Sequence, residues 1–403
     1  MRILLPNHFP LEGSGSGIYT QNVARELVAK GHAALTITPA HEEQTGFPFE
    51  TRSILFTPSG TSMPNAQRLP FNFPCFTTHP LSSLTFGDLD HAQLQMYVQI
   101  FLAAIQGAVR DWKPDLIHAQ HLWVTPYAAA KTGLPTIATA HGTDLMGFQN
   151  YPAWREIALE GAHRARAIIA ISKQVAAETR SLYDVPKEQI HIIMNGFDQA
   201  VFHEMDVQRS QVLREHGLPF ETNVLLLFVG KLTEFKGVDV LLDAAALYER
   251  VIPAVHTLII GDGELRTALR TQAKELGLQG VHFLGHQSQG KISRLLNVAD
   301  LCIVPSRAEP FGLVAVEALA CGTPVVATNE GGLPDFIDER VGALVDVDDP
   351  HGLAKTIVSE IRQDAKAKKG AFAAAFAREG FSWSSQVEKM LSLYRKTLAS
   401  HAA

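Results

Sequence analysis

Two glutamates eight residues apart are the first candidates for binding chemistry. Glu309 follows an apolar run that predicts a strand, and Glu317 lies about two turns into a helix expected to begin near Leu313. A loop carboxylate suits sugar hydroxyls, the N–H groups of Gly312 and Leu313 suit a phosphate, and Glu317 suits a ribose diol. The pattern therefore indicates a site for a sugar linked to a nucleotide.

Two lysines follow another predicted strand. Lys231 comes directly after the apolar run 224–229 and its glycine, and Lys236 lies just before a helix predicted from Val238. Two cations beside a helix N-terminus suit a diphosphate. The alternative is a pair of solvated lysines on a loop, and this segment alone does not decide between them. The two glutamates favour the diphosphate.

A glycine-rich loop follows the first predicted strand. Gly13-Ser14-Gly15-Ser16-Gly17 leads into a helix predicted over 17–30, and Gly31 suits the position after its end. Glycine lets the backbone approach a ligand, and a helix N-terminus favours an anion, so Gly15 and Gly17 are candidate binding residues. The spacing is not GxGxxG, and no acidic residue ends the second predicted strand. Dinucleotide binding is therefore disfavoured.

The elements that must position these residues are visible as short apolar runs alternating with stretches of helical period. This alternation predicts an α/β fold with parallel sheets buried on both faces. Strands are expected in a first domain at 3–5, 34–38, 116–118, 136–140, 167–171 and 190–194, and in a second at 224–229, 257–260, 281–284, 301–304 and 324–327. Two such domains leave a cleft, and ligands of open sheets bind at the carboxyl ends of strands.

The periodicity fails between residues 40 and 91, where phenylalanines and prolines are interleaved. A structureless insertion of this length is usually functional or mobile. Its aromatic side chains either pack on the surface of the first domain or form a wall of an acceptor site. The last segment, 383–398, has the pattern of an amphipathic helix.

Composition excludes several classes of protein. The 403 residues carry 35 Lys and Arg against 41 Asp and Glu, a net charge of −6, so the molecule as a whole offers no electrostatic footprint for nucleic acid or an anionic membrane. No apolar run reaches the ~20 residues of a membrane span, and the N-terminus does not resemble a signal peptide, so we expect a cytoplasmic protein. The widely spaced Cys75, Cys302 and Cys321 predict neither a disulfide nor a zinc site.

Three motifs suggest other chemistry, and each is better explained otherwise. Residues 346–348 spell DxD, which can hold a metal and a diphosphate, but they are expected to form a solvated turn. The run 285–292 is close to a phosphate-binding P-loop, yet Ile292 replaces the Ser or Thr that would bind magnesium. His118 and His121 have a spacing that suits a metal, but no third ligand follows.

The same residues carry a resemblance to a known family. The run from Glu309 to Glu317 resembles the Glu-x7-Glu motif of retaining glycosyltransferase family 4, and the chain resembles that family over almost its whole length. Further matching segments follow in the same order: Gly15 and Gly17, His141-Gly142-Thr143-Asp144, Ile171-Ser172-Lys173, Asn195-Gly196-Phe197-Asp198, Gly230-Lys231-Leu232 with Lys236-Gly237, Gly261-Asp262-Gly263, and Gly331-Gly332-Leu333-Pro334.

The resemblance implies a GT-B fold, in which two Rossmann-like, doubly wound domains face each other across a cleft. Residues 1–200 would form an acceptor-binding domain and 201–380 a nucleotide-sugar-binding domain, while 381–403 would be a helix that crosses back to the first domain. This arrangement would explain the amphipathic pattern of the C-terminal segment.

Roles for individual residues also follow from the resemblance. Lys231 and Lys236 would bind the donor diphosphate, Glu317 the ribose and Glu309 the transferred sugar. His141 would lie near the reacting centre, so His141, Glu309 and Lys236 are the expected catalytic residues. The other expected donor contacts come from Gly15, Gly17, Gly263, His286, Phe311, Gly312 and Leu313. Members of the family usually have Arg at the position of Lys231, so a bidentate phosphate contact becomes a single one here.

The expected reaction is the retaining transfer of a hexose-type sugar from a nucleotide-diphosphate sugar, with UDP as the nucleotide, to a hydroxyl of a small soluble acceptor. No metal or other cofactor is expected, and no nucleic-acid partner. By resemblance, the leaving phosphate oxygen accepts the acceptor's proton, and Glu309 orients the sugar rather than acting as a nucleophile. The alternatives are a nucleotide-sugar epimerase, a sugar phosphorylase, or a non-catalytic module that binds nucleotide sugars.

Overall fold

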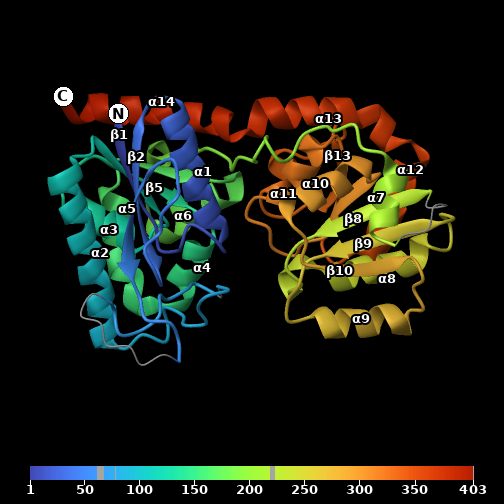
Figure 1. Ribbon diagram of the computed structural model, residues 1–403, viewed down its shortest axis with the longest axis horizontal. Helices are drawn as coiled ribbons and strands as arrows, with labels where there is room; N and C mark the ends of the chain where they lie inside the picture. The colour runs from blue at the N-terminus through green and yellow to red at the C-terminus, as the bar shows by residue number, and fades with distance from the viewer. Residues whose placement is uncertain (61–67, 78, 218–222, 403) are drawn as a thin grey trace. The chain divides into compact units, whose positions relative to one another are not determined.

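The computed structural model of this chain describes residues 1–60, 68–77, 79–217 and 223–402. Positions 61–67 and 78 of the segment 40–91 therefore lie outside the described residues, and residues 218–222 do so as well. The chain divides into two compact units (Figure 1). The first contains residues 1–194 together with 386–403, and the second contains residues 195–385.

The first unit is built on a parallel sheet of seven strands in the order β3-β2-β1-β4-β5-β6-β7. The strands are β1 (Arg2–Pro6), β2 (Ala33–Ala40), β3 (Glu50–Leu55), β4 (Leu116–Gln120), β5 (Thr136–Ala140), β6 (Ala167–Ala170) and β7 (Ile190–Ile192). The helices between them are α1 (Gly15–Ala29), α2 (His91–Trp112), α3 (Val124–Ala130), α4 (Thr143–Asn150), α5 (Arg155–Arg164) and α6 (Lys173–Tyr183). Strands β4 to β6 are fully buried, as expected for a parallel sheet covered on both faces.

The segment 40–91 is not structureless. It contains β3, which extends the sheet by pairing in parallel with β2 from Glu50 to Leu55. The prediction missed this strand because it lies at the edge of the sheet, where its polar and half-buried residues lack the continuous apolar run of a central strand. The aromatic residues of the segment pack inward, and Phe56, Phe73 and Phe86 are fully buried. This packing agrees with the simpler of the two interpretations of the segment, and a role in acceptor binding stays a prediction.

The second unit contains a parallel sheet of six strands in the order β10-β9-β8-β11-β12-β13. The strands are β8 (Val224–Val229), β9 (Val255–Ile260), β10 (Val281–Gly285), β11 (Leu301–Val304), β12 (Val325–Thr328) and β13 (Gly342–Val345), of which β13 was not among the predicted strands. The helices are α7 (Arg209–Glu215), α8 (Val238–Tyr248), α9 (Arg266–Glu275), α10 (Gln289–Val298), α11 (Leu313–Ala320), α12 (Pro350–Arg362) and α13 (Ala365–Phe381). Apolar side chains of α8 and α12 cover this sheet.

The last helix, α14 (Trp383–Ala402), returns the chain to the first unit. Tyr394 of α14 is fully buried, and its hydroxyl lies 2.6 Å from Nδ1 of His118 on β4. Glu388 forms an ion pair with Lys30 at the end of α1. The predicted C-terminal helix and its packing on the first domain are thus confirmed, and no helix of the described part of the chain is long and apolar enough to cross a bilayer.

The second unit begins and ends at neighbouring positions. The N–H of Phe197 donates a hydrogen bond to the carbonyl oxygen of Phe381 at 3.0 Å, and Phe197 forms an isolated parallel bridge with Ser382. The ring of Trp383 lies so close to Gly196 that a Cβ at that glycine would collide with it. The two segments that lead into and out of this unit are therefore packed together.

The hydrogen bond between Tyr394 and His118 yields the first testable prediction. In Tyr394→Phe, the buried Nδ1 of His118 loses its partner, and a buried polar atom without a hydrogen bond costs about 1–3 kcal/mol. Chemical denaturation should show a free energy of unfolding of the first unit lowered by about this amount. Tyr127→Phe, at a partly exposed tyrosine of the same unit, is the control, and equal stability of the two variants would contradict the prediction.

Candidate functional site

The predicted donor-binding residues of the second unit lie where its parallel strands end. Lys231 and Lys236 follow β8, Gly263 follows β9, His286 follows β10, and Glu309 follows β11. Strands β8 and β11 are neighbours in the sheet although β9 and β10 separate them in sequence, so the strand order reverses between them. In open α/β sheets such a reversal marks the usual position of a ligand site.

Lys236 and Glu309 contact each other at this edge. The Nζ atom of Lys236 lies 2.5 Å from Oε2 of Glu309, and the two side chains are 28% and 13% exposed. The other oxygen of Glu309 accepts a hydrogen bond from the N–H of Gly312 at 3.1 Å, just before α11. The structure therefore brings the cation of Lys236 to a carboxylate and a helix N-terminus that lie in another segment of the sequence.

Close backbone packing holds the loops of this edge together. Gly237 has φ +61°, and a Cβ there would collide with the carbonyl oxygen of Pro305 in the loop that follows β11. Only glycine satisfies both conditions without strain. On the other side, the N–H of Leu232 donates to the carbonyl oxygen of Asp262 at 2.9 Å, so the Gly261-Asp262-Gly263 segment packs beside the loop that carries Lys231.

Glu317 lies on α11 and is only 8% exposed. Burial raises the pKa of its carboxyl to about 8, and the negative charge of Asp198 contributes to the same shift. Asp198 belongs to the Asn195-Gly196-Phe197-Asp198 segment, to which the sequence analysis gave no role beyond the resemblance. The Glu317 carboxyl is therefore mostly protonated at pH 7, and hydrogen-bond donors placed near it would favour its charged form.

The remaining predicted residues of the second unit differ in which of their atoms could contact a ligand. The ring of Phe311 is buried and lies 5.4 Å from that of Phe336, so only its backbone can serve a donor contact. The N–H of Gly312 is already bonded to Glu309, while Leu313 begins α11. His286 and Lys231 have exposed side chains at the strand ends.

In the first unit, His141 directly follows β5 and is held by two hydrogen bonds. Its Nε2 lies 3.0 Å from Oε1 of Gln120, and its backbone N–H donates to Oδ1 of Asp144 at 3.0 Å. Oδ2 of Asp144 accepts from the N–H of Leu122 at 2.7 Å, so this buried carboxylate joins the ends of β4 and β5. Burial lowers the pKa of His141 well below its usual value, and His121 adds to the shift, so the imidazole is neutral at pH 7.

His118 and His121 differ in their surroundings, and within the described part of the chain they belong to no group of three or more side chains placed to hold a metal ion. Both ring nitrogens of His118 have partners, Tyr394 and the hydroxyl of Thr139. His121 has φ +67°, is 1% exposed, and has no hydrogen-bond partner for either ring nitrogen among the described residues. Its ring lies 4.7 Å from that of His141, centroid to centroid, and is surrounded by aromatic side chains.

Contacts within the chain explain most of the glycine-rich loop after β1. Ser14 caps α1 by accepting a hydrogen bond from the N–H of Gly17 at 3.0 Å. A Cβ at Gly17 would collide with the carbonyl oxygen of Pro10, so the close approach here is between parts of the same chain. Gly15 faces open space, and it is the position where a ligand could approach the backbone of this loop.

Sequence reasoning missed Arg307, which lies two residues before Glu309. Its guanidinium forms a bidentate ion pair with Asp239 on α8 and a second ion pair with Asp348. Asp348 is the second aspartate of the DxD sequence. Its partner is Arg307 of the same unit and not a metal-ligating side chain. Among the described residues, no cluster of His, Cys, Asp or Glu is placed to hold a metal ion. Cys75, Cys302 and Cys321 are buried free thiols.

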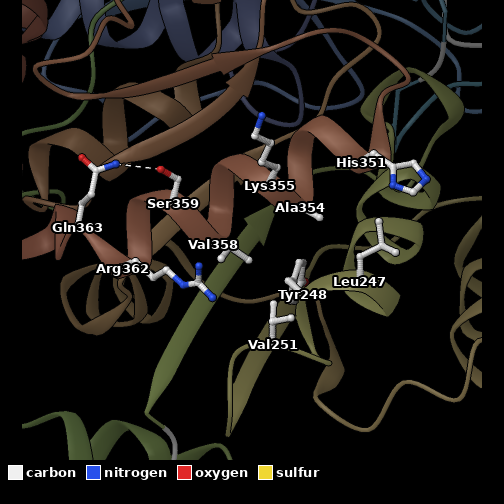
Figure 2. A pocket seen from close by; sticks show the side chains of 10 residues that line it. All are labelled: Leu247, Tyr248, Val251, His351, Ala354, Lys355, Val358, Ser359, Arg362 and Gln363. Carbon is white, nitrogen blue, oxygen red and sulfur yellow. Dashed lines mark hydrogen bonds between the residues drawn. The ribbon is translucent and has the colours of Figure 1, made fainter.

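A groove of about 590 Å³ lies elsewhere on the second unit, between α8 and α12 (Figure 2). The apolar side chains of Leu247, Val251 and Val358 line it, and so do Lys355 and Arg362 of α12. None of the predicted donor-binding residues lines this groove, so it is distinct from the edge described above.

Comparisons with known proteins agree with the family that the sequence motifs resemble. Residues 210–373 match the model of the "Glycosyl transferases group 1" family, and residues 13–201 match that of "Glycosyltransferase Family 4". A D-inositol 3-phosphate glycosyltransferase from Mycobacteroides abscessus is 33% identical over 343 residues, which cover 79% of this chain and 74% of the relative.

Two solved structures share the fold. Sucrose-phosphate synthase from Thermosynechococcus elongatus has a TM-score of 0.75 at 22% identity, covering 99% of this chain and all of the other. HepE from Anabaena, solved with UDP and also with UDP-glucose, has in its UDP complex a TM-score of 0.74 at 22% identity over 98% of this chain and all of its own. The chain has the GT-B fold and belongs to glycosyltransferase family 4; it is a glycosyltransferase.

Proposed function

We propose that this enzyme moves a hexose-type sugar from a UDP-sugar to a hydroxyl of a small soluble acceptor, with retention of configuration and without a metal ion. The pair of Lys236 and Glu309 carries the proposal, because it presents a cation and a carboxylate side by side at the carboxyl edge of the second sheet. The cation matches the charge of a diphosphate, and the carboxylate matches the hydroxyls of a sugar.

The substrates are inferred from the proteins that this chain resembles. HepE of Anabaena, which shares the fold, is solved with UDP and with UDP-glucose, and this supports a uridine nucleotide as donor. The relative from Mycobacteroides is named for D-inositol 3-phosphate, which is a small phosphorylated cyclitol. This name supports a small acceptor rather than a polymer. A cytoplasmic setting stays a prediction, to which the three buried free thiols are suited.

Donor binding requires Lys236 and Glu309 to exchange partners. Without ligand, Glu309 neutralises Lys236 and accepts the N–H of Gly312. A diphosphate at Lys236 competes with that carboxylate and can take over both donors. Glu309 then becomes available to accept hydrogen bonds from the sugar, so that diphosphate binding and sugar orientation are coupled.

The chemical step is proposed to depend on charge stabilisation. Negative charge grows on the diphosphate as the bond to the sugar breaks, and Lys231 and Lys236 offset it. The sugar passes through an oxocarbenium-like state, and the acceptor hydroxyl attacks from the face that the diphosphate leaves. The departing phosphate oxygen accepts the hydroxyl proton, so Glu309 remains an orienting group. His141, neutral at pH 7, contributes a polar contact rather than a charge.

The first measurement is the binding of UDP, GDP and ADP to the purified protein by calorimetry in excess EDTA. We expect UDP to bind most tightly and added magnesium to leave its affinity unchanged. A requirement for magnesium would refute the metal-independent mechanism, and preference for another nucleotide would refute the choice of uridine. Turnover of UDP-glucose that requires inorganic phosphate as co-substrate would instead indicate a phosphorylase.

Glu309→Gln and Lys236→Ala test the pair directly. Each variant should lower sugar transfer by about 10²–10³-fold, because each removes a charged contact that is strongest in the transition state. The readout is UDP released from UDP-glucose, with D-inositol 3-phosphate as the probe acceptor. Lys355→Ala, in the groove of Figure 2, is the matched control and should keep full activity. Near-wild-type rates in either site variant would refute the proposed roles.

Because the pKa of Glu317 is raised, we expect nucleotide binding to be coupled to the release of a proton. The ribose diol donates hydrogen bonds, which favour the carboxylate, so UDP binding at pH 7 should release about one proton. Calorimetry in buffers of different ionisation enthalpy measures this release, which should be absent in Glu317→Gln. In Asp198→Asn, the pKa of Glu317 falls toward its usual value, so fewer protons are released. Equal release by Glu317→Gln and the wild-type protein would contradict this account.

The same shift affects the stability of the free protein. Because Glu317 holds its proton more tightly in the folded state than in the unfolded state, its contribution to the free energy of unfolding decreases as the pH rises from 4.5, the ordinary pKa of a glutamate, to about 8.

A further inference from the structure

Arg307 connects three segments around the predicted donor site. Its Nη1 and Nη2 atoms donate to the two carboxylate oxygens of Asp239, at 2.9 and 2.6 Å. Its Nε donates to Oδ1 of Asp348 at 2.6 Å, in the turn between β13 and α12. Its Nη1 also donates to the carbonyl oxygen of Glu234, at 2.8 Å. One side chain thus joins the loop after β11 to the loop after β8, to the first turn of α8 and to the turn after β13.

The backbone of Arg307 strengthens the same connection. Its N–H donates to the carbonyl oxygen of Phe235 at 2.8 Å, and the N–H of Ala308 lies 3.3 Å from the same oxygen. Phe235 is the residue before Lys236, and Ala308 is the residue before Glu309. The loops that carry the lysine and the glutamate are therefore bonded to each other one residue away from each functional side chain.

The geometry of Arg307 is more restrictive than that of the pair it supports. A guanidinium is a planar fork, and three acceptor groups around it leave little freedom of rotation. The side chain of Arg307 is 24% exposed, and those of Asp239 and Asp348 are 39% and 56% exposed, so the restriction comes from the number of acceptors around the guanidinium and not from exclusion of water. Lys236 and Glu309, by contrast, are joined to each other by a single contact, although Glu309 also accepts a hydrogen bond from the N–H of Gly312. Their relative position in the presence of a ligand must therefore come from the loops beneath them.

We propose that Arg307 is a positioning residue that sets the separation between Lys236 and Glu309, so that one donor molecule can contact both at once. Asp348 and Asp239 hold the guanidinium in place, which gives the DxD sequence of this chain an anchoring role. The inference rests on the proposed function, since it assumes that Lys236 meets the β-phosphate and Glu309 the sugar.

A series of three nucleotides separates positioning from general stability. Calorimetry in EDTA would give the Kd of UMP, UDP and UDP-glucose for each variant. The gain in affinity from UMP to UDP reports the β-phosphate contact, and the gain from UDP to UDP-glucose reports the sugar contact. Base and ribose bind through other residues, so UMP affinity is the internal control.

We expect Arg307→Gln to leave UMP affinity unchanged and to reduce the combined gain from UMP to UDP-glucose by about tenfold or more, the effect of losing one charge-assisted contact. Arg307→Lys, which keeps the charge but lacks the fork, should lose a similar part of the gain. Asp348→Asn should lose less, because the bidentate pair with Asp239 remains. In a Lys236→Ala background, Arg307→Gln should add little to the loss of the β-phosphate gain.

Arg294→Gln is the matched control. Arg294 forms a bidentate ion pair with Glu215 between α10 and α7 of the same unit, at 2.8 and 3.0 Å. This variant should keep all three affinities. Equal behaviour of Arg307→Gln and Arg294→Gln would overturn the positioning role, and so would a uniform loss of affinity for all three nucleotides in Arg307→Gln. If the wild-type protein gained nothing from UMP to UDP-glucose, the proposed function itself would fail, and the inference with it.

Discussion

Parallel pairing of the strands is the constraint on which this structure depends. In each unit the carboxyl ends of all paired strands lie on one edge of the sheet, so residues far apart in sequence are collected there. Lys236 and Glu309 meet because β8 and β11 are neighbours at the point where the strand order reverses. In the first unit, β4 and β5 bring His121 and His141 together in the same way.

The chemistry of this edge requires the loops to approach one another closely. A residue with a side chain at Gly237 would push the loop after β8 away from Pro305, and with it Lys236 away from Glu309. The charged groups add a second level of order, because Arg307 binds carboxylates and carbonyl oxygens from segments on both sides. Arg307 thus links the loop that carries Glu309 to the loop that carries Lys236.

Much of the fold followed from the sequence, because buried parallel strands are continuous apolar runs and these are easy to recognise. Edge strands are harder: β3 mixes polar and apolar residues, and its hydrogen bonds to β2 decide its conformation. The positions of Lys231 and Glu309 directly after strands were predictable for the same reason. Arg307 was not, because Asp239 and Asp348 lie 68 and 41 residues away from it in sequence. Phe311 was predicted as a donor contact from its place in the motif, but its side chain packs against Phe336 in the core. Only its backbone is left for a contact with the donor.

The bonding of Phe197 to Phe381 has a consequence for the ancestry of such chains. Topologically, residues 195–385 are a module inserted into the first unit, whose own chain resumes in α14. Because the module starts and finishes at one place, it can be exchanged, duplicated or deleted at the level of the gene without opening a gap in its host. A recombination event that respects these two junctions would join an existing first unit to a new second unit in a single step.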